Sequence, residues 1–183
     1  MKNIIRAAIT AVVLSLGLAA PSAAGPFEDG LAAYGRGDYA TAIQLLRPFA
    51  DQGNADAQSS LGFMYQNGRG VPHDDAIAVA WYQKAADQGN ANAQNNLGFM
   101  YQNGRGVPHH DAIAVTWYQK AADQGNAQAQ HNLGVMYQNG RGVSQDDAAA
   151  LSWFRKAADQ GYAPAQDNLE LMRLHGRDLS STG

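Results

Sequence analysis

The chain has 183 residues, enough for one modest domain, and its formal net charge is −3. A dedicated nucleic-acid binder needs a surplus of Lys and Arg, so this balance argues against that class. The chain has no cysteine, which excludes disulfide scaffolds, thiolate zinc sites and cysteine nucleophiles. Its 20 glycines need an explanation, because glycine destabilises the interior of the helices that the rest of the pattern predicts.

The first 24 residues have the pattern of a secretory signal peptide. Basic residues precede an apolar stretch at 7–20, and Pro21 and several small residues follow it. The apolar stretch is short for a bilayer-spanning helix, which favours cleavage after Ala24 over retention as a membrane anchor. Because the short basic start is typical of bacterial signals, we expect a periplasmic or secreted protein without stable membrane insertion after cleavage.

A 36-residue repeat occupies most of the remaining chain. The first two full copies differ at only five positions, and the third differs from the second at eleven. One helix pair cannot bury both of its apolar stripes, whereas stacked pairs bury a continuous core, so the repeat predicts a solenoid. The segments are a shortened N-terminal capping copy, three full copies, a C-terminal half copy and a polar tail, at residues 25–52, 53–88, 89–124, 125–160, 161–174 and 175–183.

Each full copy contains two predicted helices, which we call helix A and helix B. In the first full copy, Asn54 is the expected N-cap of helix A, which runs over about 55–67 until Gly68 ends it. Helix B begins after Asp74 or Asp75, either of which is a suitable N-cap. Its apolar side chains recur at helical spacing and form one stripe at Ala78, Trp81, Tyr82 and Ala85.

Several positions in each copy match a known family of helical repeats. Leu61-Gly62, Tyr65, Ala78 and Tyr82 resemble the tetratricopeptide repeat, and the 36-residue length with its Asn-Gly-Arg-Gly-Val turn resembles the longer Sel-one-like repeat (SLR). The resemblance implies an all-α, right-handed superhelical solenoid of antiparallel helix pairs. It also implies a non-enzymatic scaffold or adaptor that binds a protein or peptide partner. Bacterial members of this family are linked to envelope assembly and secretion.

Three positions of helix A drift among the copies and lie on one helix face. By the resemblance, this face lines the concave groove of the solenoid, and a glutamine later in helix A continues it. We expect an amide-rich, weakly charged groove with Phe63 and Phe99 as apolar anchors, although a solvent-exposed stripe without a ligand is the alternative. The predicted partner-binding residues are Asp56, Ser59, Phe63, Gln66, Asn92, Asn95, Phe99, Gln102, Gln128, His131, Val135 and Gln138.

Two other sets of recurring side chains favour structural roles. The histidines are too sparse along the repeat for a tetrahedral metal site, so neither a metal nor a cofactor is expected. An arginine recurs in each glycine-rich turn, at Arg69, Arg105 and Arg141. We expect each arginine to reach an aspartate of its own or the adjoining copy, such as Asp87 or Asp123.

Catalysis is not expected either. Some relatives in the resembled family are linked to penicillin binding, but no serine here precedes a lysine by three residues, as a serine enzyme of that class requires. The alternative function is a binder or hydrolase-like protein that acts on cell-wall material or β-lactams. Self-association through the exposed ends of the solenoid is also left open by the sequence.

Overall fold

The computed structural model describes residues 25–175, so the predicted signal peptide and nearly all of the polar tail lie outside the described residues. Within that range the chain is all-helical, with nine helices and no strand. No helix in this part of the chain combines the length and apolar character needed to cross a membrane. The helices are α1 (Pro26–Gly35), α2 (Tyr39–Asp51), α3 (Ala55–Asn67), α4 (Asp75–Asp87), α5 (Ala91–Asn103), α6 (Asp111–Asp123), α7 (Ala127–Asn139), α8 (Asp147–Asp159) and α9 (Ala163–Leu174).

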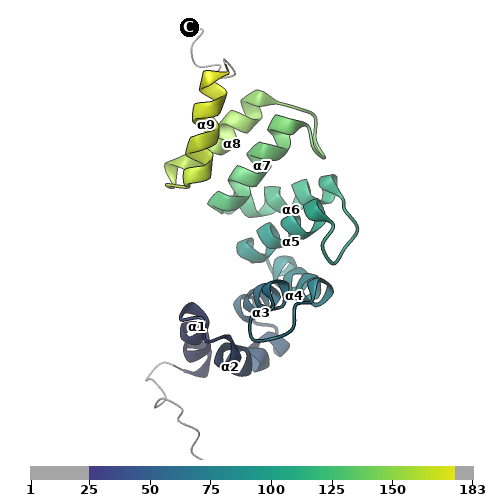
Figure 1. Cartoon of the computed structure of the whole chain (residues 1–183), viewed down its shortest axis with the longest axis vertical. Helices are drawn as coiled ribbons and strands as arrows, with labels where there is room; N and C mark the ends of the chain where they lie inside the picture. Colours follow the sequence, from purple (N-terminus) through teal and green to yellow (C-terminus); the bar gives the residue numbers. More distant parts are fainter. Residues whose placement is uncertain (1–24, 176–183) are drawn as a thin grey trace, which may run out of the picture.

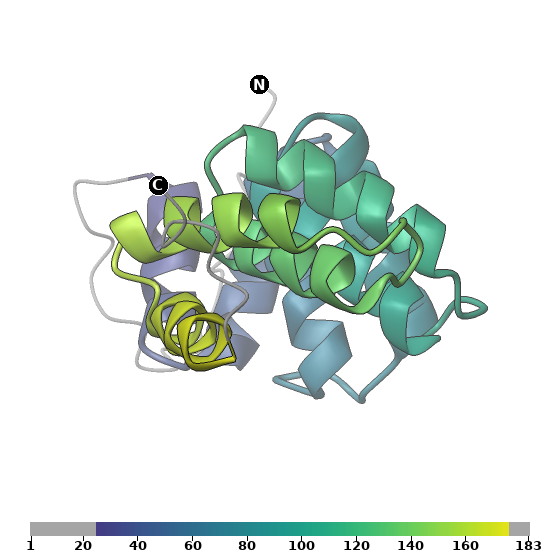
Figure 2. The same cartoon turned by 90° about the horizontal axis from the view of Figure 1, so that it is seen from above.

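The helices stack as pairs into a crescent with α1 and α9 at its two tips (Figure 1). Each odd-numbered helix is a helix A; α1, α3, α5 and α7 pack on the helix B that follows them, and each helix B also packs on the next helix A. Viewed along the long axis, successive pairs fan out around that axis, so the stack is a superhelix (Figure 2). The predicted solenoid of helix pairs is therefore confirmed.

Side-chain caps and glycines set the ends of the helices. In the first full copy, the Asn54 side chain accepts a hydrogen bond from the Ala57 backbone N–H at 2.9 Å, as an N-cap does. Of the two predicted caps for helix B, Asp74 is the N-cap and Asp75 is the first helical residue. Gly68 ends α3 with a φ of 62°, a left-handed conformation that glycine adopts without strain.

The two helices of each pair touch where a helix A glycine faces a bulky helix B side chain. A Cβ added to Gly98 would lie 2.8 Å from two ring carbons of Tyr118, which is fully buried. Because real side chains do not pack this closely, only glycine allows the observed approach of α5 and α6. The same contact recurs in the other pairs, at Gly30 with Leu46, Gly62 with Tyr82, and Gly134 with Phe154.

The last helix carries charge at the positions where a further helix B would pack. Glu170 stands at the position that glycine occupies in the earlier A helices, and it forms an exposed ion pair with Arg173 at 2.7 Å. A second copy of this chain that continued the stack here would bury both charges, at a high cost in desolvation. This charged pair therefore disfavours self-association by continued stacking on α9, although Leu171 and Leu174 of the same helix are exposed.

We expect Gly98→Ala to lower the free energy of unfolding by about 1–3 kcal/mol, because the added methyl group would force the buried Tyr118 ring out of its place. Gly35→Ala is the matched control, since a Cβ at that helical glycine meets nothing within 4 Å. Urea unfolding followed by circular dichroism measures both variants. If both substitutions lowered the free energy of unfolding equally, the contact of Gly98 with Tyr118 would not be the cause.

Candidate functional site

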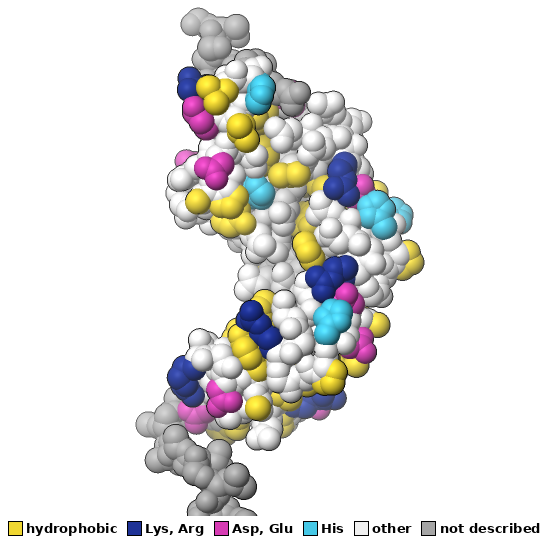
Figure 3. All heavy atoms as spheres, in the orientation of Figure 1, with side chains coloured by type: hydrophobic (Ala, Val, Ile, Leu, Met, Phe, Trp, Pro, Cys, Tyr) yellow, Lys and Arg dark blue, Asp and Glu magenta, His cyan; other side chains and the backbone are white. Residues whose placement is uncertain are grey.

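A pocket of about 430 Å³ lies on the A-helix side of the stack and draws on four successive A helices. The hollowed edge of the crescent is mostly neutral polar surface (Figure 3). Six of the twelve predicted groove residues line the pocket, namely Asp56, Ser59, Phe63, Asn92, Asn95 and Gln128. The prediction had not included the other lining residues, which are Leu31, Tyr34, Ser60, Asn90 and Asn96.

Asparagine side chains on the A helices form hydrogen bonds from one repeat to the next. The Asn126 side-chain amide donates to Asn92 Oδ1 at 3.0 Å, and the Asn132 amide donates to Asn95 Oδ1 at 3.0 Å. Asn95 is only 2% exposed, so it supports the pocket floor and offers little surface to a partner. Some of the side chains that vary among the copies therefore form hydrogen bonds between repeats, and not all of them are free surface residues.

His131 occupies the position equivalent to Asn95 and continues the same set of hydrogen bonds. Its Nε2 lies 2.8 Å from Asn168 Nδ2, and its Nδ1 lies 3.4 Å from Asn132 Oδ1. Since an amide nitrogen can only donate, the partners fit a neutral imidazole with its hydrogen on Nδ1. Burial disfavours the charged ring and lowers the pKa of His131, although the hydrogen bond with Asn132 opposes this.

Two of the three glutamines that were expected to continue the groove instead bind helix B of their own pair. Gln66 Oε1 accepts a hydrogen bond from the Tyr82 hydroxyl at 2.6 Å, and Gln102 Oε1 accepts one from Tyr118 at 2.6 Å. Burial raises the pKa of both phenols, so they stay protonated donors. The third, Gln138, has no such donor because Phe154 replaces the tyrosine of its pair.

The apolar side chains expected in the groove differ in exposure. Phe63 is partly buried, with the Tyr34 ring 5.7 Å away and the Arg69 guanidinium 5.0 Å from its centroid. Val135 is also partly buried and packs against the core beneath α8 and α9. Phe99 is 37% exposed, which makes it the most accessible of the three.

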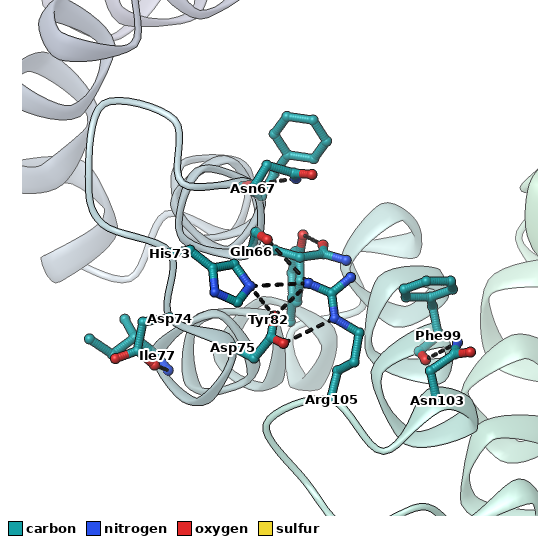
Figure 4. A network of polar contacts seen from close by, with 11 residues as sticks. Gln66, Asn67, His73, Asp74, Asp75, Ile77, Tyr82, Phe99, Asn103 and Arg105 are labelled. Carbon is teal, nitrogen blue, oxygen red and sulfur yellow. Dashed lines mark hydrogen bonds and ion pairs between the residues drawn. The ribbon is translucent and has the colours of Figure 1, made fainter.

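The recurring arginines pair with aspartates other than the expected ones. Arg105 makes a bidentate contact with Asp75 of the preceding copy, at 3.0 Å from Nε and 2.8 Å from Nη2 (Figure 4). Its Nη2 also donates to the Gln66 backbone carbonyl at 3.2 Å. Asp87 instead accepts a hydrogen bond from Gln83 at 2.8 Å. The prediction that an arginine of the turn reaches an aspartate of its own or the adjoining copy is confirmed for Arg105, but the choice of Asp87 and Asp123 is wrong because those residues lie at the opposite end of helix B.

At the next junction the turn arginine again contacts an aspartate, whereas at the first junction it contacts a tyrosine. Arg141 makes a bidentate contact with Asp111, at 3.2 Å and 2.9 Å. At the N-terminal junction Tyr39 stands at the equivalent position, and Arg69 donates to its hydroxyl at 2.5 Å. Burial raises the pKa of Asp75 and Asp111, but the hydrogen bond and charge of the arginine, with a smaller contribution from a histidine, hold both pKa values below their usual range.

Buried glutamines form a second inter-repeat connection that the sequence analysis missed. Gln58, which is 4% exposed, donates to the Ala50 carbonyl at 3.0 Å and accepts from the Gln88 side chain at 2.7 Å. The ends of two successive B helices are thereby joined through one amide. The next two copies repeat the arrangement with Gln94 and Gln124, and with Gln130 and Gln160.

Two histidines in the turns lie within hydrogen-bonding distance of the aspartates that the arginines contact. His73 Nε2 lies 3.2 Å from Asp75 Oδ1, and His109 Nε2 lies 3.1 Å from Asp111 Oδ1. Across the described range, 25–175, no group of three or more His, Asp or Glu side chains is placed to hold a metal ion.

The Sel1 repeat family model matches residues 27–54, 55–90, 91–126 and 127–162. The chain belongs to the Sel1 repeat family. Three of the matched units begin where α3, α5 and α7 begin. Sel1 repeats form a superfamily similar to tetratricopeptide repeats, and proteins built from them are generally protein-interaction scaffolds.

Solved structures of Sel1 repeat proteins share this architecture. A Sel1 repeat protein from Oxalobacter formigenes is 36% identical with a TM-score of 0.79, over 84% of this chain and 61% of that chain. A protective antigen present in uropathogenic Escherichia coli strains, which displays an SLR fold, is 40% identical with a TM-score of 0.77, over 82% of this chain and 33% of that chain. This chain therefore spans less than two thirds of either protein.

A more distant structure supports the fold alone. Helicobacter pylori cysteine rich protein B is 24% identical with a TM-score of 0.54, over 78% of this chain and 96% of that chain. No relative among the curated proteins matches the chain.

We expect Arg105→Lys to lower the free energy of unfolding by about 1–2 kcal/mol, because lysine cannot form the bidentate contact with Asp75. Arg173→Lys is the control, since its partner Glu170 is three residues away and both side chains are more than half exposed. Thermal and urea unfolding measure both variants. A loss for Arg173→Lys as large as that for Arg105→Lys would contradict the assignment of Arg105 to the junction.

The lowered pKa of His131 predicts a pH-dependent loss of stability. Between its folded and unfolded pKa values, the unfolded chain binds more protons, so stability falls as the pH falls. The contribution of His131 to the free energy of unfolding keeps its full value above about pH 6.5, the usual pKa of histidine, and decreases progressively below that pH. Unfolding free energies measured between pH 7.5 and pH 5 test this expectation.

His131→Asn is the matched variant, because asparagine occupies the equivalent position of the preceding copy. An asparagine side chain can still accept from Asn168 but has no proton to gain, so this part of the pH dependence should disappear. An unchanged pH profile in the variant would show that His131 does not cause it.

Proposed function

We propose that this chain is a non-enzymatic scaffold or adaptor of the bacterial envelope or exterior, which binds a peptide or protein segment in the A-helix pocket. The pocket carries the proposal, because several neutral amide side chains converge on it from successive helices. Amide groups can both donate to and accept from a peptide backbone. The hydrogen bonds between repeats hold some of these groups in place before a ligand arrives, which lowers the entropy cost of binding.

The charge around the pocket supports a protein partner over a nucleic acid. Among the described residues that line the pocket, Asp56 alone carries a charge, and the Arg69 guanidinium lies beside the pocket, 5.0 Å from the centroid of the Phe63 ring. One arginine beside the pocket is fewer than the surplus of cations that binds a phosphate backbone. The envelope or secreted location rests on the signal-peptide pattern of residues 1–24.

Site-specific photocrosslinking in the native bacterium tests this proposal. A photoreactive residue at Asn92, which is exposed and lines the pocket, should give a discrete protein adduct. The same probe at Ile77, which is 40% exposed on α4, should not give that adduct. A Gln128→Ala variant should weaken the Asn92 adduct while its melting temperature stays unchanged, since this pocket-lining side chain is exposed.

Identical adducts from both probe positions would place the interaction elsewhere and contradict the pocket assignment. Hydrolysis of nitrocefin by the purified protein would contradict the non-enzymatic role. The Gln128→Ala variant spares Asn95 and Gln102, because their buried or hydrogen-bonded side chains help hold the stack together.

A further inference from the structure

On each A helix, an apolar residue directly follows the position of the close helix contact. These residues form an apolar row across the A helices. Because the glycine contact sets the register of the first four pairs, the next side chain lies at the same height on each of their A helices. Within the row Phe99 is 37% exposed and Leu171 is 49% exposed, while the others are partly buried. The row consists of Leu31, Phe63, Phe99, Val135 and Leu171.

A polar row runs parallel to it, seven residues earlier in each full copy. Seven residues are about two helical turns, so the two rows lie about 10 Å apart along each helix. Asp56, Asn92 and Gln128 form the polar row, and all three are exposed pocket-lining residues. A segment that crosses the A helices between the rows would meet apolar groups on one side and polar groups on the other.

The spacing of the A helices selects the conformation of such a segment. Packed helices lie about 8–10 Å apart, and α3 and α5 contact each other directly. A polyproline-II helix has three residues per turn and rises about 3.1 Å per residue, so its side chains return to the same side after about 9 Å. A β-strand repeats after about 6.6 Å, which is too short, and an α-helix would reach successive A helices only with every second turn, about 10.8 Å, which is too long.

We propose that the groove binds a polyproline-II segment with an apolar side chain at every third position and basic residues between them. Each apolar side chain contacts one member of the apolar row, beginning with Leu31 and Phe63 in the pocket. The basic residues face the polar row, where Asp56 is the charged residue of the pocket. They lie away from the apolar row, where Arg69 and Arg105 lie over the Phe63 and Phe99 rings. This inference rests on the proposed function and specifies the partner that the same pocket accepts.

Fluorescence anisotropy with synthetic 12-residue peptides tests the period. The first peptide repeats Leu-Pro-Lys, and a second has the same composition with leucine at irregular spacing. We expect the irregular peptide to bind at least tenfold more weakly, because its leucines cannot all contact the row together. Equal affinity of the two peptides would overturn the three-residue period.

Two variants and a third peptide test the position and the charge. Phe99→Ser should weaken binding of the regular peptide at least fivefold, whereas Ile77→Ser, which is similarly exposed on α4, should leave it unchanged. Replacing lysine by glutamate in the peptide should weaken binding about fivefold, and Asp56→Asn should reduce that difference. Binding that is insensitive to Phe99→Ser, or an unchanged charge preference in Asp56→Asn, would overturn the proposal.

The outcomes also separate this inference from the proposed function. If none of the peptides binds but the Asn92 crosslink forms, the partner is not a polyproline-II segment and only the inference fails. If neither the peptides nor the crosslink is observed, both the inference and the proposed function fail.

Discussion

The contact of a helix A glycine with a bulky helix B side chain is the constraint on which the rest of the structure depends. A side chain at Gly62 or Gly98 would have no space, because the backbone of helix A packs directly against a tyrosine ring of helix B. At this distance the Tyr82 hydroxyl reaches Gln66, which adds a polar bond beside the apolar contact. The glycine also sets the register of helix A, and thereby the height of every side chain in the groove.

Polar bonds join successive pairs in addition to the apolar clusters that α4 shares with α5, α6 with α7, and α8 with α9. Gln58 joins successive B helices, Arg105 joins a turn to the preceding helix B, and Asn132 joins successive A helices. Hydrogen bonds and ion pairs have stricter geometry than apolar contacts, so they specify how one pair is rotated against the next. The asparagine connections lie on the groove side, so the same bonds that stack the repeats also position the candidate binding groups.

The helices and their apolar stripes were predictable from the sequence, because apolar residues recur at the same positions in several copies of the repeat. The arginine partners were not predictable in the same way. Asp75 and Asp87 both recur near the ends of helix B, and only the three-dimensional rotation of one pair against the next brings Asp75 to Arg105. The contribution of α1 to the pocket was missed because its copy is shortened. Aligning Gly30 with Gly62 would have placed Leu31 beside Phe63 and indicated it.

The A-helix groove, held in place by its inter-repeat hydrogen bonds, is the proposed binding surface. Nuclear magnetic resonance of the ¹⁵N-labelled protein, titrated with the Leu-Pro-Lys peptide, tests it most directly. Binding in the groove should shift the side-chain amide signals of Asn92, Asn96 and Gln128, with little change in those of Gln83 and Gln119 on the B helices. Shifts confined to the B helices, or an absence of shifts in the groove amides at saturating peptide, would contradict it.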